Sequence, residues 1–186
     1  MGCAVDFERV RREAREVRSA AAVSAAFDAM AARITARLAS RNPLVVAVMH
    51  GGVYAAVHLC ARLDFPHEFD YVHVSRYGAS LEGGDLEWIV PPKAAFRGRT
   101  VLLVDDVLDR GATLAALHAE LERIGVAELQ TAVLVTKEAP SPHPRPRVDY
   151  VGFETGPEYL FGCGMDYMGR WRHLPSLYAV PVVDAA

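Results

Sequence analysis

Apolar residues recur along this chain in two patterns, short continuous runs and runs at helical spacing. The clearest example of both patterns lies at residues 100–124. An apolar run at residues 100–104 is followed by an acidic segment and then by an amphipathic stretch. The amphipathic stretch carries Leu114, Leu117, Leu121 and Ile124. A continuous run is typical of a strand buried on both faces, and the helical spacing is typical of a helix with one face on a core. This stretch therefore predicts a strand, an acidic loop and a helix.

The same two patterns predict elements along the rest of the chain. Residues 7–38 are predicted to be helical, with an apolar stripe formed by Val23, Phe27, Met30, Ile34 and Leu38. Further strands are expected at residues 44–48, 71–78, 86–90, 129–136 and 149–153, and a further helix at residues 53–63. This order of elements predicts an α/β fold with a mostly parallel central sheet flanked by helices.

Residues 1–186 are predicted to form a single domain, with residues 1–40 as its helical N-terminal part. The length is sufficient for one domain with a sizeable core. Residues 140–146 contain four prolines. Strand signals resume after them, so this segment is interpreted as an extended loop and not as a domain boundary.

Composition narrows the class of protein. Apolar residues make up 52% of the chain, which excludes a disordered protein, and the net charge of −3 gives no general electrostatic case for binding nucleic acid. The sequence contains no run of about 18 apolar residues, so no membrane span is expected. The three cysteines, Cys3, Cys60 and Cys163, lie far apart and suit a reducing compartment, which predicts a cytoplasmic protein.

The acidic segment carries the clearest chemistry. It follows the carboxyl end of a strand, where open α/β sheets place their ligands, and the free N–H groups of the next helix suit a phosphate. Gly111 allows the main chain to approach an anion closely, and Thr113 adds a hydroxyl donor. Asp105 and Asp106 are acceptors suited to ribose hydroxyls or to hydrated Mg²⁺. One loop could therefore hold a sugar, its phosphate and a metal ion.

Two other interpretations of this segment have to be compared with the first. An apolar run that ends in two aspartates is also found in nucleotide hydrolases, but these need a Gly-Lys dipeptide in a phosphate loop, and this chain has none. A solvated strand end explains one or two acidic residues. It does not explain the whole order from Asp105 to Thr113.

Two further segments suggest ligand contacts more weakly. His50-Gly51-Gly52 follows the strand at residues 44–48 and resembles a second anion-binding turn, although an ordinary tight turn has the same pattern. Ser75 and Tyr77 precede a glycine-containing segment between two predicted strands. That arrangement suits a lid, and a surface hairpin is the alternative.

Two stretches carry a resemblance to a known family. The order Asp-Asp-x-x-Asp-x-Gly-x-Thr from Asp105 to Thr113 resembles the phosphoribosyl-pyrophosphate (PRPP) loop of the purine phosphoribosyltransferases. Residues 151–154, 162–167 and 172–174 resemble the carboxy-terminal signature of the hypoxanthine-guanine enzymes, namely Val-Gly-Phe-Glu, Gly-x-x-x-Asp-Tyr and Arg-x-Leu. The resemblance covers roughly residues 44–180 and implies a type I phosphoribosyltransferase fold. Residues 148–180 would contribute a small hood over the purine.

The resemblance also implies a role for each matching residue. PRPP ribose and 5-phosphate binding falls to Asp105, Asp106, Asp109, Arg110, Gly111, Ala112 and Thr113. Pyrophosphate binding falls to His50, Gly51, Gly52 and Arg172, with a non-proline cis peptide near Met49–His50. Purine binding falls to Lys137, Tyr159 and Leu160, general-base catalysis to Asp109, and the flexible lid to Ser75 and Tyr77. The cofactor implied is Mg²⁺, associated with Asp166, Asp105 and Asp106.

The sequence departs from the family pattern before the glycines at His50, in the lid segment, where Arg76 is inserted between Ser75 and Tyr77, and within the PRPP loop. His50 stands where a lysine often precedes the glycines, so the charge of this donor would depend on pH. Arg110 occupies a position that is commonly threonine, and it replaces a hydroxyl with charged donors. Ala112 contributes only its backbone. Neither departure removes the loop amides or Thr113.

The predicted reaction is transfer of the 5-phosphoribosyl group from PRPP to N9 of hypoxanthine or guanine, which gives IMP or GMP and pyrophosphate in purine salvage. The alternative class is a regulator that keeps the fold and binds PRPP or nucleotides without turnover. An enzyme for another base, such as xanthine or a pyrimidine, also stays open. Expected partners are PRPP and a 6-oxopurine, with no nucleic acid and no membrane, and the resemblance implies a homodimer or homotetramer.

Overall fold

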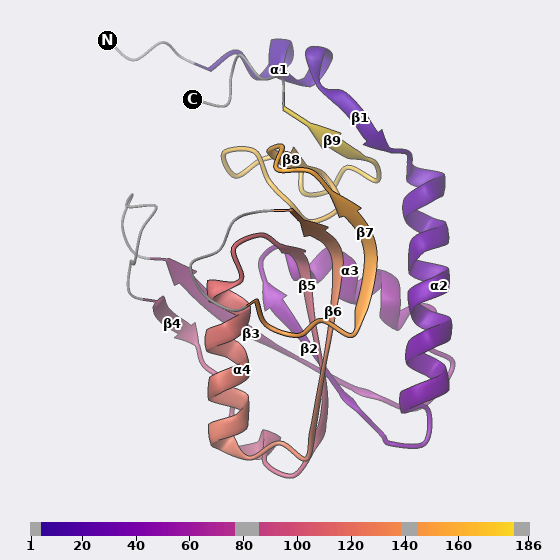
Figure 1. Cartoon of the computed structure of the whole chain (residues 1–186), viewed down its shortest axis with the longest axis vertical. Coiled ribbons are helices and arrows are strands. Elements are labelled where there is room, and N and C mark those ends of the chain that lie inside the picture. The colour runs from indigo at the N-terminus through magenta and orange to yellow at the C-terminus, as the bar shows by residue number, and fades with distance from the viewer. Residues whose placement is uncertain (1–4, 77–85, 139–144, 181–186) are drawn as a thin grey trace.

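The computed structural model describes residues 5–76, 86–138 and 145–180 and is built on a six-stranded sheet. Its strand order is β4 (Leu86–Val90), β3 (Glu68–Arg76), β2 (Leu44–Met49), β5 (Thr100–Leu108), β6 (Glu128–Lys137) and β7 (Tyr150–Thr155). All neighbours are parallel except β3 and β4 (Figure 1). The predicted α/β class and mostly parallel sheet are confirmed. Each predicted strand is present, with ends that shift by up to four residues. The largest shift carries β5 past the predicted end at residue 104 to Leu108, so that Asp105 and Asp106 belong to the strand. Residues 77 and 78 of the predicted strand at 71–78 lie outside the described residues.

Helices cover both faces of the sheet. On one face lie α2 (Ala20–Leu38) and α3 (Gly52–Cys60), and on the other lie α4 (Ala112–Ile124) and the short 3₁₀ helix η1 (Ala94–Phe96) (Figure 1). The stripes predicted for α2 and α4 are buried, from Val23 to Leu38 and from Leu114 to Ile124. Strand β5 is buried over nearly its whole length because both helical layers pack against it.

The N-terminal segment corrects one prediction. Residues 7–38 do not form one helix, because α1 (Phe7–Glu13) ends at Ala14 and a strand, β1 (Arg15–Arg18), precedes α2. The Ser19 hydroxyl caps α2 by accepting a hydrogen bond from the backbone N–H of Ala22 at 3.3 Å. Local charge and helical spacing concealed this break, because β1 forms by pairing with a strand far away in the sequence.

A second, smaller sheet forms the hood at the carboxyl edge of the main sheet (Figure 1). It has the order β1, β9 (Leu177–Ala179) and β8 (Leu160–Phe161), and both pairings are antiparallel. The sequence predicted a hood from the carboxy-terminal third but did not predict that β1 joins it. Both ends of the described chain therefore build one structure.

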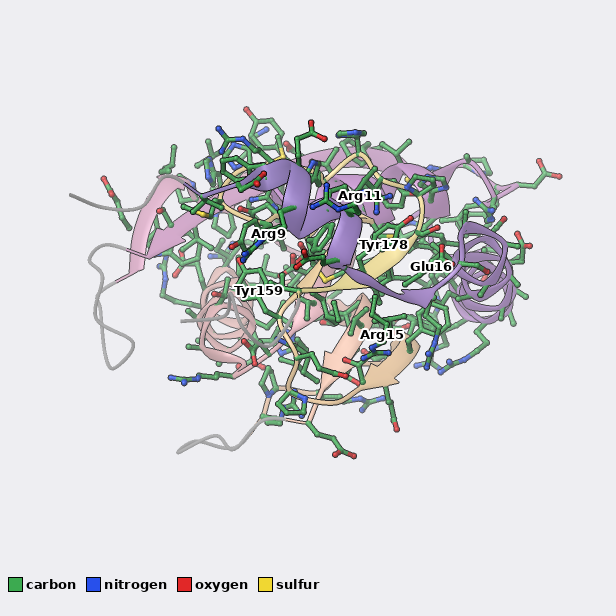
Figure 2. The ribbon with its side chains drawn as sticks, turned by 90° about the horizontal axis from the view of Figure 1, so that it is seen from above. Arg9, Arg11, Arg15, Glu16, Tyr159 and Tyr178 are labelled. Atoms are coloured by element: carbon green, nitrogen blue, oxygen red, sulfur yellow. The ribbon has the colours of Figure 1, made fainter. Side chains whose placement is uncertain are left out.

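Helix α1 closes the hood from outside. Val10 is buried with Phe161, Tyr167 and Val180. Seen from above in Figure 2, Arg11 lies beside Tyr178, and its guanidinium carbon is 4.1 Å from the centre of that ring. In the part of the chain that the structure describes, no helix is both long enough and apolar enough to cross a membrane.

Replacing Val10 tests how much this closure stabilises the fold. Val10→Ala removes buried methyl groups and leaves a cavity, so we expect the free energy of unfolding to fall by about 2 kcal/mol. Val5→Ala is the control, because Val5 is 37% exposed. Urea unfolding followed by circular dichroism measures both variants. Equal stability of Val10→Ala and the unsubstituted chain would show that α1 packs only loosely on the hood.

Candidate active site

The acidic loop joins the carboxyl end of β5 to the start of α4. Gly111 stands at the N-cap of α4 in the left-handed region, with φ 86°, and a β-carbon there would lie 2.8 Å from Cδ of Pro146. Glycine is therefore required both by the backbone conformation and by the space. A pocket of about 190 Å³ opens over this turn, lined by residues 105–111 together with Thr113 and Leu114. The helix start and the loop give it the character of an anion site.

Arg145 fastens this loop from outside and was not predicted. Its Nη2 atom donates to the backbone oxygens of Leu108 and Asp109 at 2.9 and 2.8 Å. Pro146 follows it and contacts Gly111. The sequence gives no signal that Arg145 binds the acidic loop, because Arg145 lies in a proline-rich segment that is remote from the loop in sequence. The contact exists only because the chain returns to the carboxyl edge of the sheet before β7.

The two adjacent carboxylates at the end of β5 are buried, each with 8% of its surface exposed. The backbone N–H of Asp106 donates to Oδ1 of Asp105 at 2.9 Å, and that of Val107 donates to Oδ1 of Asp106 at 2.7 Å. Burial raises the pKa of both groups, and the charge of Asp106 raises the pKa of Asp105 further. A cation or a pair of ribose hydroxyls would offset this unfavourable burial.

The glycine loop after β2 packs directly on these carboxylates. The peptide bond between Met49 and His50 is cis, as the resemblance implies. A β-carbon on Gly51 would lie 1.9 Å from Oδ2 of Asp106, so only glycine allows the two segments to approach this closely. His50 is exposed beside the loop, and its ring centre lies 4.5 Å from that of His73. His73 was not predicted as a site residue.

A second pocket, of about 200 Å³, joins the acidic loop to the hood. Its lining consists of Asp106, Val107, Asp109, Lys137, Tyr159, Leu160, Met165 and Asp166. Because β5 and β6 are parallel neighbours, Lys137 lies beside Asp109, with 3.9 Å between Nζ and Oδ2. Tyr159 is half-exposed, and its hydroxyl donates to the backbone oxygen of Asp166 at 3.1 Å. The three residues predicted to bind purine therefore share one pocket with Asp109, the predicted general base.

Arg172 and Asp166 form a tight pair at the edge of this pocket. Nη2 of Arg172 lies 2.5 Å from Oδ1 of Asp166, and Nη1 donates to the backbone oxygen of Gly164 at 2.6 Å. The backbone N–H of Gly169 donates to the other carboxylate oxygen of Asp166 at 2.7 Å. Both oxygens of Asp166 thus already accept from protein donors.

The donor set fits a magnesium ion that is held largely by substrate. Within the described ranges, no group of three or more histidine, cysteine, aspartate or glutamate residues is arranged to hold a metal ion. Mg²⁺ typically keeps several waters and binds one or two carboxylates together with substrate phosphates. Asp105 and Asp106, buried side by side, match that pattern better than Asp166, whose oxygens are engaged by Arg172 and Gly169.

The predicted lid is described only in part. Ser75 lies near the end of β3, opposite Glu87 of β4. Tyr77 lies outside the described residues. Of the predicted binding residues, Arg110 and Ala112 are exposed on the loop at the start of α4, and Thr113 is partly buried there.

Residues 13–167 match the phosphoribosyl transferase domain family. The chain belongs to this family. Among curated relatives, the bifunctional protein TilS/HprT of Listeria innocua is 34% identical over 77% of this chain, which spans only 22% of that longer protein. The hypoxanthine-guanine-xanthine phosphoribosyltransferase of Tritrichomonas foetus is 32% identical over 80% of this chain and 81% of its own length. The predicted family membership is confirmed.

Solved structures confirm the predicted fold of this chain. A hypoxanthine phosphoribosyltransferase from Staphylococcus aureus superposes with a TM-score of 0.86 over 98% of this chain and all of the other, at 21% identity. The superposition therefore covers nearly the whole of both chains. At this level of identity the similarity concerns the fold alone.

Asp105 provides a test of the electrostatics of the site. Its raised pKa means that the folded chain binds the proton more tightly than the unfolded chain. The resulting stability is fully present below the unfolded pKa of about 3.9 and is lost as pH rises through the folded pKa. We expect Asp105→Asn to remove this loss and to raise the free energy of unfolding near neutral pH by about 1–2 kcal/mol.

Urea unfolding at a series of pH values measures this effect. The asparagine oxygen can still accept the Asp106 N–H, so the local hydrogen bond is retained. Asp64→Asn, at an exposed position, is the matched control and should change stability little at any pH. A loss of stability in Asp105→Asn at neutral pH would contradict the expectation.

Proposed function

We propose that this chain transfers the 5-phosphoribosyl group from PRPP to N9 of hypoxanthine or guanine, giving IMP or GMP and pyrophosphate in purine salvage. The observation that carries the proposal is the shared pocket of Asp109, Lys137 and Tyr159, which adjoins the anion loop at the start of α4. The names of the relatives that are about 30% identical support it, since they include hypoxanthine, guanine and xanthine phosphoribosyltransferases. A regulator need not keep such a base pocket.

In this proposal the acidic loop holds PRPP by its 5-phosphate and ribose. The backbone N–H groups from Arg110 to Thr113 and the Thr113 hydroxyl bind the phosphate at the start of α4. Asp105 and Asp106 accept hydrogen bonds from the ribose hydroxyls or hold Mg²⁺. Asp166 of the hood is proposed to assist in holding Mg²⁺. Arg145 holds the loop in place through its two carbonyl contacts.

The purine occupies the pocket between the acidic loop and the hood. Tyr159 stacks on the base, the main chain at Leu160 reads its edge, and Lys137 donates to O6. As N9 forms its bond to C1 of the ribose, Asp109 accepts the proton from N7. Positioned acid–base groups of this kind contribute roughly 10²- to 10⁴-fold to rate. Lys137 would disfavour a 6-aminopurine, because that base presents a donor where Lys137 also donates.

Pyrophosphate departs with the electron pair of its bond to C1, so its growing negative charge has to be stabilised. His50, the amides of Gly51 and Gly52, and Arg172 are proposed to bind it. Arg172 carries five N–H donors, so it can bind pyrophosphate while it still engages Asp166 and Gly164. Mg²⁺, when bound, would neutralise part of the pyrophosphate charge. Ser75 and Tyr77 are proposed to belong to a lid over this site.

A coupled assay of pyrophosphate release tests the reaction with hypoxanthine, guanine, xanthine and adenine. We expect turnover with a 6-oxopurine and none with adenine. Asp109→Asn should lower kcat by about 10²- to 10⁴-fold and leave PRPP binding nearly unchanged, because the loop amides and the 5-phosphate site remain. Near-normal kcat in this variant would remove Asp109 from the mechanism. Tight PRPP binding without turnover on any base would favour the regulator.

The proposal includes a homodimer or homotetramer in the cytoplasm, with no nucleic-acid or membrane partner. An apolar surface on the outer part of the sheet supports self-association. Phe69, Tyr71 and Ile89 are 52%, 41% and 52% exposed on β3 and β4, and Val57 of α3 is 56% exposed. In register, Phe69 and Tyr71 lie beside Val45 and Ala47, which are fully buried. The apolar face therefore continues from the core out to the surface.

Phe69→Glu tests this surface. A buried, unpaired carboxylate at an interface is strongly unfavourable, so we expect the assembly to dissociate toward monomers in sedimentation velocity. Met168→Glu is the matched control, because Met168 is 57% exposed on the hood and should leave the assembly intact. An unchanged sedimentation coefficient for Phe69→Glu would exclude this face from the interface.

A further inference from the structure

His73 lies beside the proposed pyrophosphate loop without an assigned role. It is on β3, directly across from Met49 in the parallel pairing with β2. Its ring meets that of His50 edge-on, with 4.5 Å between ring centres and 68° between ring planes. Two imidazoles from different strands thus converge at the carboxyl edge of the sheet, next to the loop of Gly51 and Gly52.

The titratable groups around this pair come from four elements. They are Tyr71 on β3, Glu87, which lies opposite Ser75 on β4, His50 from the loop after β2, and Asp106 of β5, whose carboxylate lies against Gly51. Burial lowers the pKa of His73, and the charge of His50 lowers it further. A bound anion would oppose both effects, because its negative charge favours the protonated form of His73.

We propose that His73 is a further pyrophosphate-binding residue that acts together with His50. An imidazole N–H of each ring would donate to the same diphosphate group of PRPP, and then to the released pyrophosphate. This inference rests on the proposed function, since it concerns the leaving group of that reaction. The second ring places another donor beside His50, which is exposed next to the glycine loop.

Equilibrium binding of pyrophosphate, measured by isothermal titration calorimetry, tests His73 directly. His73→Phe keeps a flat ring against His50 but has no N–H donor, so it separates binding from packing. We expect it to raise the Kd for pyrophosphate about tenfold, and the KM for PRPP similarly, with little change in the KM for the purine. Tyr71→Phe, two residues away on the same strand, is the matched control and should bind as the unsubstituted chain does.

The pH dependence provides a readout that packing alone would not change. The advantage of the unsubstituted chain over His73→Phe should shrink as pH rises through the mildly acidic range toward neutrality, because His73, whose pKa is lowered in the free chain, loses its proton there. A Kd for His73→Phe equal to that of the unsubstituted chain would overturn the inference. So would an equal loss in Tyr71→Phe, or a loss that does not vary with pH.

The same measurements distinguish failure of the inference from failure of the proposed function. Turnover on 6-oxopurines with pyrophosphate binding that does not depend on His73 would overturn the inference alone. Pyrophosphate binding that depends on His73, without turnover on any base, would overturn the proposed reaction and keep the site. A chain that neither binds pyrophosphate nor turns over would overturn both.

Discussion

The parallel pairing of β5 with β2 on one side and β6 on the other is the constraint on which the site depends. Parallel strands end at the same edge of a sheet. Because of this, two loops and one strand end that are far apart in sequence lie close together there. The acidic loop follows β5, the glycine loop follows β2, and Lys137 ends β6. β5 is buried under helices on both faces, and its pairing with β2 and β6 sets where each of the three strands ends.

The same edge concentrates groups that oppose folding. Asp105 and Asp106 are buried side by side with raised pKa values, and Gly51 is pressed against the second of them. Apolar burial elsewhere in the two main cores has to offset this cost. Sites built to bind charged ligands commonly carry such unfavourable charge in the free protein, since the ligand or its metal supplies the compensation.

Sequence alone could predict whatever depends on local order. The acidic loop is one continuous segment, so its residues and their placement before α4 followed from the pattern, and Lys137 followed once β5 and β6 were taken as neighbours. The missed features depend on contacts between distant segments. β1 forms only by pairing with β9, Arg145 reaches the loop only because the chain returns there, and His73 meets His50 only across two strands. Periodicity carries no information about these contacts.

The hood shows how such a distant contact reaches the proposed purine pocket. β1 pairs with β9, and β9 pairs with β8, where Leu160 lines that pocket. On the outer side, Val10 of α1 packs with Phe161, the residue that follows Leu160. No side chain of the described N-terminal segment lines this pocket. The segment can act on it by two routes. One is the position of β8, and the other is the hydrogen bond from Nη2 of Arg15 in β1 to Oε1 of Glu158 at 2.8 Å, next to Tyr159. Stability of the hood and shape of the proposed purine pocket are therefore coupled.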